Sequence, residues 1–215
     1  IIMNKIYIFY IFIKNKAIFG SSVFAKYIKV LLNFNSGYLH NSVERDGSSL
    51  YLVSAKVIRY IYCKFVNNTA PLGNMFSVTA FSNIIDGHSD YIDNANVNTL
   101  RFNEGKSYLS YPNIYINNSA IKLGGCISLS KIKLVDLVSV FSNSNHADAF
   151  GEFLYAEIIE NITINNNIII HNKAHYGAGV YLKTISNSII VSQLRSSYNI
   201  ADRQGGTMYN YYKCS

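Results

Sequence analysis

The sequence predicts an all-β protein, a right-handed parallel β-helix of about eight coils with a period of about 26 residues. Three observations predict it. One motif recurs along nearly the whole chain of 215 residues, short apolar runs alternate with period two, and no long stretch shows the 3.6-residue period of a helix. The segments YINNSAIKLGGCISL (115–129) and YNIADRQGGTMY (198–209) show the recurrence most clearly. We expect residues 1–215 to form one β-helix domain that belongs to a longer repeat protein.

The first column of the repeat is an asparagine. Its eight anchors are spaced by 24 to 28 residues: Asn15, Asn41, Asn68, Asn94, Asn118, Ser144, Asn172 and Asn199. An amide side chain both donates and accepts, so stacked asparagines can bond to one another and to the turn backbone. Ser144 cannot continue such an amide ladder, and we therefore expect a local break at that coil.

Three more columns keep the same phase. An aromatic residue or isoleucine precedes the anchor by three positions: Phe12, Tyr38, Phe65, Tyr91, Tyr115, Phe141 and Ile169. A small residue, usually alanine, follows two positions later, with Ala147 one place late, and a glycine follows after five to seven. We interpret these columns as core, tight bend and left-handed exit turn. One coil cannot bury its apolar side alone, but coils stacked about 4.8 Å apart can bury it between them. Crossover connections between parallel strands favour a right-handed helix.

The aromatic–asparagine element resembles a known repeat. It is carried by Phe12-Ile-Lys-Asn15, Tyr38-Leu-His-Asn41, Phe65-Val-Asn-Asn68 and Tyr115-Ile-Asn-Asn118, and its glycine half by Gly124-Gly125-Cys126-Ile127 and Gly205-Gly206-Thr207-Met208. Together they are similar to the repeats of chlamydial polymorphic outer membrane proteins and of large β-helical surface proteins of protozoa. The resemblance implies a pectin-lyase-like β-helix on an extracellular or membrane-attached protein, often in adhesion, and it brings no catalytic residues.

The charge is uneven along the chain. The net charge is +7, and residues 1–64 carry all of that excess, with nine Lys or Arg against Glu44 and Asp46. A segment with this excess of positive charge could bind a membrane surface. No Lys/Arg run or nucleic-acid motif accompanies it, so we expect no nucleic-acid partner. Membrane attachment is expected through regions outside this chain.

The start of the chain and the cysteines leave alternatives open. The apolar run Ile6–Ile13 after Met3 could be the core of a signal peptide or part of the first coil, and residues 3–20 fit both interpretations. Cys63, Cys126 and Cys214 are too few and too scattered for a disulfide framework. We expect no cofactor. Because neither end has the sequence of a capping helix, we expect further coils at the ends of the rod, or an end prone to association.

Two groups of residues are candidates for chemistry. Asp148, His175 and Asp202 follow the alanine column in consecutive coils, so they should stack and could bind a ligand or metal, or form a solvated edge. The segment IIDGHSDYID supplies Asp86, His88 and Asp90, which could bind a cation or form a solvated turn between coils.

The leading functional hypothesis is a non-catalytic structural or interaction module of a surface or secreted protein, which binds a glycan or protein partner or acts as a spacer. The alternative is a polysaccharide lyase or hydrolase of the pectate-lyase-like fold. That class would require paired acidic residues on adjacent coils, and only Asp86, Asp90 and Arg101 offer a loose match. A fold by itself supplies no activity.

Overall fold

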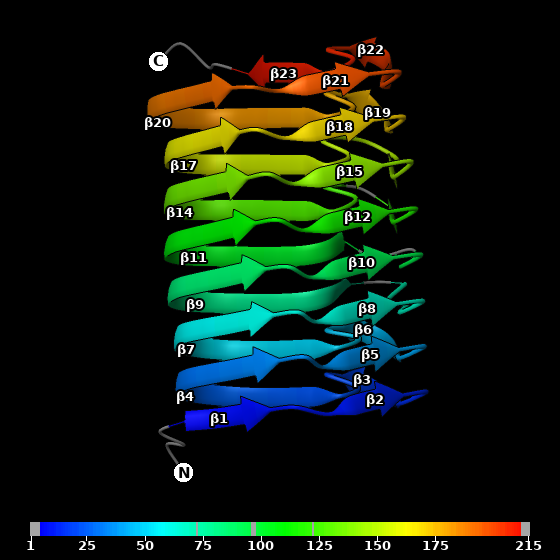
Figure 1. The fold of residues 1–215 in the computed structure, drawn as a ribbon, viewed down its shortest axis with the longest axis vertical. Helices are drawn as coiled ribbons and strands as arrows, with labels where there is room; N and C mark the ends of the chain where they lie inside the picture. Colours follow the sequence, from blue (N-terminus) through cyan, green and yellow to red (C-terminus); the bar gives the residue numbers. More distant parts are fainter. Residues whose placement is uncertain (1–4, 72, 96–97, 122, 212–215) are drawn as a thin grey trace.

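The chain forms a parallel β-solenoid. The structure is a computed structural model that describes residues 5–71, 73–95, 98–121 and 123–211. Figure 1 shows its strands stacked along one long axis, from β1 at one end to β23 at the other. One sheet stacks eight strands, one for each anchor of the repeat, so the solenoid has about seven turns with a period of about 27 residues. The prediction of an all-β rod of parallel coils is confirmed.

Two long sheets form the body of the rod, and all their pairings are parallel. The nine-stranded sheet contains β1 (Lys5–Ile8), β4 (Val23–Phe34), β7 (Leu50–Ile61), β9 (Asn74–Gly87), β11 (Asn98–Tyr111), β14 (Ile127–Val138), β17 (Leu154–Asn165), β20 (Val180–Ser192) and β23 (Met208–Tyr211). The eight-stranded sheet contains β2 (Ile11–Ile13), β5 (Gly37–Leu39), β8 (Lys64–Val66), β10 (Asp90–Ile92), β12 (Ile114–Ile116), β15 (Phe141–Asn143), β18 (Ile168–Ile170) and β21 (Arg195–Ser197).

Short strands close each coil. A four-stranded sheet joins β13 (Ser119–Ala120), β16 (His146–Ala147), β19 (Lys173–Tyr176) and β22 (Ile200–Gln204). Near the other end of the rod, β3 (Lys16–Phe19) pairs with β6 (Ser42–Asp46). Single bridges link Ser42 to Thr69 and Thr69 to Ala95 between these two sheets. This third side therefore continues along the rod with one short segment in each coil.

Each coil turns at left-handed residues, and most of them are not glycine. In one coil, Ile158 (φ 56°) bends the long strand β17, Asn166 (φ 54°) leads into β18, His171 (φ 54°) precedes the anchor and Gly177 (φ 56°) ends the third side. Glycine thus supplies positive φ at one corner only. Non-glycine residues adopt this region at a cost of about 1–2 kcal/mol each, so the hydrogen bonds and packing of neighbouring coils must hold the other corners.

The side-chain amide ladder runs unbroken from Asn15 to Asn172, and the expected break at Ser144 is wrong. Asn145 occupies the anchor: its Oδ1 accepts from Asn118 Nδ2 over 3.0 Å, and its Nδ2 donates to Asn172 Oδ1 over 3.1 Å. Ser144 lies one residue earlier, exposed, at the left-handed corner with φ 55°. With Asn145 as the anchor, Ala147 falls into the alanine column in normal phase, where it packs against Ala174.

The aromatic column forms a stack inside the rod. The rings of Phe12, Tyr38, Phe65, Tyr91 and Tyr115 follow one another with centroids 5.0, 4.8, 4.9 and 4.6 Å apart. Phe141 does not continue this stack, because the corrected register places buried Ser142 at the core position and leaves Phe141 partly exposed. The column then passes to buried Ile169, which pairs with Ser142.

The apolar run at the start of the chain lies in the first coil. Ile6–Ile8 belong to β1 and Ile11–Ile13 to β2, in parallel register with β4 and β5. Met3 and Cys214 lie outside the described residues, whereas Cys63 and Cys126 are buried free thiols. The described part of the chain contains no helix long and apolar enough to cross a membrane.

Candidate functional site

The predicted file of Asp148, His175 and Asp202 is divided into two pairs. His175 Nδ1 lies 3.2 Å from Asp202 Oδ2, across neighbouring coils. Asp148 instead contacts His146 of its own coil, with 2.9 Å between Asp148 Oδ1 and His146 Nε2. All four side chains are solvent-exposed to about half of their area (44–58%). The structure therefore brings together two of the three predicted residues, in the exposed setting where such pairs contribute little stability.

The candidate cation ligands Asp86, His88 and Asp90 lie in different environments. Asp86 is fully buried inside the rod, whereas His88 is exposed at a left-handed corner and stacks on Tyr62, with ring centroids 4.9 Å apart. Asp90 is half-buried in β10. Within the described ranges, no group of three or more His, Cys, Asp or Glu could hold a metal ion. Arg101, the third member of the loose enzyme match, is exposed on β11 and so does not share the interior with Asp86.

Asp86 belongs to a buried polar cluster that no sequence motif predicted. The hydroxyl of Tyr91 donates to Asp86 Oδ1 over 3.0 Å, and those of Tyr108 and Tyr115 donate to Oδ2 over 3.3 Å each. Burial raises the pKa of the Asp86 carboxyl to about 8, and the hydroxyls limit the rise because they stabilise the ionised form. This cluster joins four neighbouring strands of the core and has no opening to solvent at Asp86.

Glu152 is a second carboxyl inside the rod. It is fully buried, and burial raises its pKa well above the usual range. Gly125 in the preceding coil leaves the space that Glu152 fills, since a Cβ at Gly125 would lie 2.7 Å from Glu152 Oε1. The thiol of Cys126 makes a long contact to the same oxygen, with Sγ 4.0 Å away. Burial thus favours the protonated form of Glu152, which lies inside the core and not in a surface groove.

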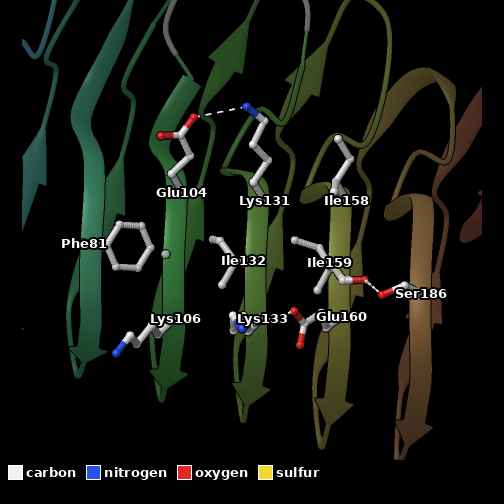
Figure 2. Close-up of a pocket in the computed structure, with 11 residues that line it drawn as sticks. Phe81, Glu104, Lys106, Lys131, Ile132, Lys133, Ile158, Ile159, Glu160 and Ser186 are labelled. Atoms are coloured by element: carbon white, nitrogen blue, oxygen red, sulfur yellow. Dashed lines mark hydrogen bonds and ion pairs between the residues drawn. The ribbon is translucent and has the colours of Figure 1, made fainter.

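A shallow groove of about 420 Å³ follows the bend of the long strands. Figure 2 shows its charged residues in two files on either side of the apolar file of Ile132 and Ile159. Glu104 pairs with Lys131 (3.1 Å) on one side, and Lys133 pairs with Glu160 (3.6 Å) on the other. These two exposed pairs neutralise each other, and Lys106 leaves the lining with a single excess positive charge, so the groove has only a weak electrostatic preference for an anion.

A second groove, of about 450 Å³, has a different lining. We call it the C-terminal groove; its residues are Phe150, Tyr176, Tyr181, Arg203, Gln204, Tyr209 and Tyr211. The Arg203 guanidinium lies over the Tyr176 ring, 5.5 Å from its centroid, and its Nη1 donates to the Tyr176 hydroxyl over 2.9 Å. Tyr181 and Tyr209 stack with centroids 5.3 Å apart, and Tyr209 lies 5.8 Å from Tyr176. The groove thus combines ring edges, phenol hydroxyls, an amide and an exposed cation.

The repeat itself builds the C-terminal groove. Tyr155, Tyr181 and Tyr209 are register partners on β17, β20 and β23, so their side chains form one outward file. Phe150 and Tyr176 are linked by a bridge and stack with centroids 5.2 Å apart. The sequence carried a signal for this file, because each of the three tyrosines stands four residues after the glycine of its coil. The tyrosine file was not predicted, because only the columns that recur in most coils had been interpreted.

No protein-family model, no curated protein and no solved structure matches this chain. The functional residues are accordingly interpreted from their own geometry, and the likeness to outer-membrane repeats extends only as far as the parallel β-solenoid.

Proposed function

We propose that this chain is a non-catalytic interaction module of a surface or secreted β-helix protein, and that its C-terminal groove binds a glycan. The observation that carries the proposal is the convergence of Tyr176, Tyr181 and Tyr209 with Arg203 in one open groove on the side of the rod. Extracellular location and adhesion follow from the resemblance of the repeat and belong to the same proposal.

The chemistry of the groove suits a sugar. Phenol hydroxyls and the Gln204 amide both donate and accept, as sugar hydroxyl groups do. The Arg203 guanidinium presents a planar set of donors that matches a carboxylate or sulfate group. The partly exposed rings of Phe150 and Tyr176 add apolar area beside these polar groups. A concave site with a few convergent polar groups is the usual form of a small-ligand site.

Titration calorimetry with short oligosaccharides, neutral and uronic, tests this proposal. We expect binding that weakens about tenfold in Arg203→Gln, since a charge-assisted contact is worth about 1.5–3 kcal/mol, and that also weakens in Tyr209→Ala. Tyr62→Ala is the matched control, because Tyr62 is exposed on another corner of the rod. Oligosaccharide binding that both groove variants leave unchanged would contradict the site.

The same samples test the absence of catalysis. Incubation with uronate and neutral polysaccharides should release no new reducing or unsaturated ends. Cleavage that persists in a highly purified sample would overturn the non-catalytic part of the proposal in favour of the lyase or hydrolase alternative.

A further inference from the structure

The C-terminal groove has a counterpart near the other end of the rod. We call it the N-terminal cluster; it consists of Phe19, Phe24, Arg45 and Tyr51. Its members occupy the same columns of the repeat as Tyr176, Tyr181, Arg203 and Tyr209, counted from the column glycines Gly20, Gly47, Gly177 and Gly205. Tyr51 and Tyr209, for example, each stand four residues after their glycine.

The two sets also share their geometry. Arg45 lies over Phe19 at 5.8 Å from the ring centroid, as Arg203 lies over Tyr176 at 5.5 Å. The rings of Phe19 and Tyr51 are 5.5 Å apart at 52°, and those of Tyr176 and Tyr209 are 5.8 Å apart at 51°. The third contact repeats as well: Phe24–Tyr51 at 5.4 Å matches Tyr181–Tyr209 at 5.3 Å. The solenoid therefore presents one aromatic–arginine arrangement twice.

A single straight file connects the two arrangements. Register partners lead from one coil to the next through Phe24, Tyr51, Ser77, Arg101, Ser128, Tyr155, Tyr181 and Tyr209. Phe24 and Tyr181 are six steps apart, which is about 29 Å at about 4.8 Å per step. Arg101 stands midway and is exposed. Both arrangements therefore lie on the same side of the rod, with a cation between them.

The charge of this side is positive. Exposed Lys26, Arg45, Arg101 and Arg203 lie on or beside the file. Beside the file, Glu157 pairs with Lys183, and Asp46 accepts a hydrogen bond from Asn74 but keeps its negative charge, so the four cations remain in excess. A partner that follows the file should thus be long, linear and anionic.

We propose that the N-terminal cluster and the C-terminal groove bind one linear polysaccharide with carboxylate or sulfate groups, laid along the rod axis across Arg101. This inference rests on the proposed glycan binding at the C-terminal groove and extends it in ligand class and in valency. A polymer that reaches both sites binds the second one at high effective concentration, so avidity exceeds the affinity of either site alone.

The stacking of the rings favours a polysaccharide over a single-stranded nucleic acid. Proteins bind bases by stacking them on free aromatic faces. Here Tyr155, Tyr181 and Tyr209 cover one another's faces, with centroids 5.4 and 5.3 Å apart. Tyr155 and Tyr181 are only 6% exposed, so the file offers none of the free ring faces that bases require. The accessible groups are partly exposed Tyr209 and exposed Arg203, whose hydroxyl and guanidinium suit sugar hydroxyls and carboxylates.

The experiment measures binding of polygalacturonate oligomers of graded length. Oligomers shorter than about 29 Å should bind two per chain, and longer ones should bind one per chain with about tenfold or more higher affinity. Arg45→Gln and Arg203→Gln should each abolish the gain with length. Arg101→Gln should reduce it, and added salt should weaken it. Arg59→Gln, which removes an exposed cation from a different file of β7, should change nothing.

Each result bears on one proposal or the other. Affinity independent of length, or a length effect that survives Arg45→Gln, overturns the bivalent inference while short-oligomer binding at Arg203 still supports the proposed function. Equal binding of oligo(dT) would overturn the polysaccharide assignment. Because both Arg→Gln changes are at exposed positions, the fold should survive them, and the unfolding midpoint of each variant verifies this.

Discussion

Asn118 and Asn145 lie in consecutive coils, and both the backbone N and the Nδ2 of Asn118 donate to Asn145 Oδ1, over 2.9 and 3.0 Å. Asn145 Nδ2 lies within hydrogen-bond distance of Tyr115 O, Ser142 Oγ and Asn172 Oδ1, which share its two N–H groups. One side chain thus satisfies buried groups from four neighbours. The ladder is therefore the element of the rod in which single substitutions should be most costly.

Replacing Asn145 with alanine should destabilise the protein by about 3 kcal/mol, because several buried donors and acceptors lose their partners at once. Ser144→Ala, one residue away and exposed, should stay within about 0.5 kcal/mol of wild type. Urea unfolding followed by circular dichroism measures both. Equal effects at the two positions would show that Asn145 is not the ladder residue.

Stability should fall as the pH rises from 5 to 9. The pKa of the Asp86 carboxyl is raised to about 8 in the folded protein, against about 3.9 in an unfolded chain. The stabilising contribution is then fully present below about pH 4 and is lost as the pH rises through 8, because the folded state retains a proton that the unfolded state releases. The unfolding midpoint measured across this range tests the direction.

Asp86→Asn should make that dependence less steep, since the amide does not titrate, while the raised pKa of buried Glu152 retains the rest of the fall. Asp90→Asn, on the half-buried strand β10, should keep the wild-type fall. An Asp86→Asn variant that loses stability with pH as steeply as wild type would assign the titration to another group.

Ile158→Asn should stabilise the protein by about 1 kcal/mol. Ile158 is β-branched, has φ 56° and is 48% exposed, so it carries left-handed strain with little burial in return. Asparagine adopts this region more readily. Ile114→Asn is the control, because Ile114 is 40% exposed in the regular strand β12, where asparagine is disfavoured and stability should fall. Thermal unfolding midpoints compare the two, and a loss at both sites would refute the strain at Ile158.

Gly105 should tolerate alanine only if Phe81 is reduced in size. A Cβ at Gly105 would lie 2.1 Å from Phe81 Cζ, so Gly105→Ala forces the ring to move and should cost about 1–3 kcal/mol. In the double variant with Phe81→Leu, the cost should be less than the sum of the two single changes. Chemical denaturation of the four proteins completes this cycle, and strict additivity would show that the ring yields freely.

Much of the architecture was predictable from the sequence because every coil needs the same residue types at its core, bend and ladder positions. The aromatic column, the small residues at the bend and seven of the eight ladder asparagines each recur in phase, so a chance match at one coil is outweighed by the others. The error at Ser144 shows the limit of that method: Ser144 and Asn145 both fit the spacing, and only the hydrogen-bonding partners in Asn118 and Asn172 distinguish them.

The sequence by itself determined the period, the parallel stacking and the residues that fill the core. Tertiary structure alone decided which way each side chain points and which residues meet across coils. Asp86 and His88, two residues apart, are separated by a corner into core and solvent. Arg45 and Arg203, far apart in sequence, recur in one geometry on one side of the rod. The physical reason is that contacts in a solenoid form between residues about one period apart. The local sequence therefore determines the path of each coil, whereas the surface depends on which residues the register places side by side.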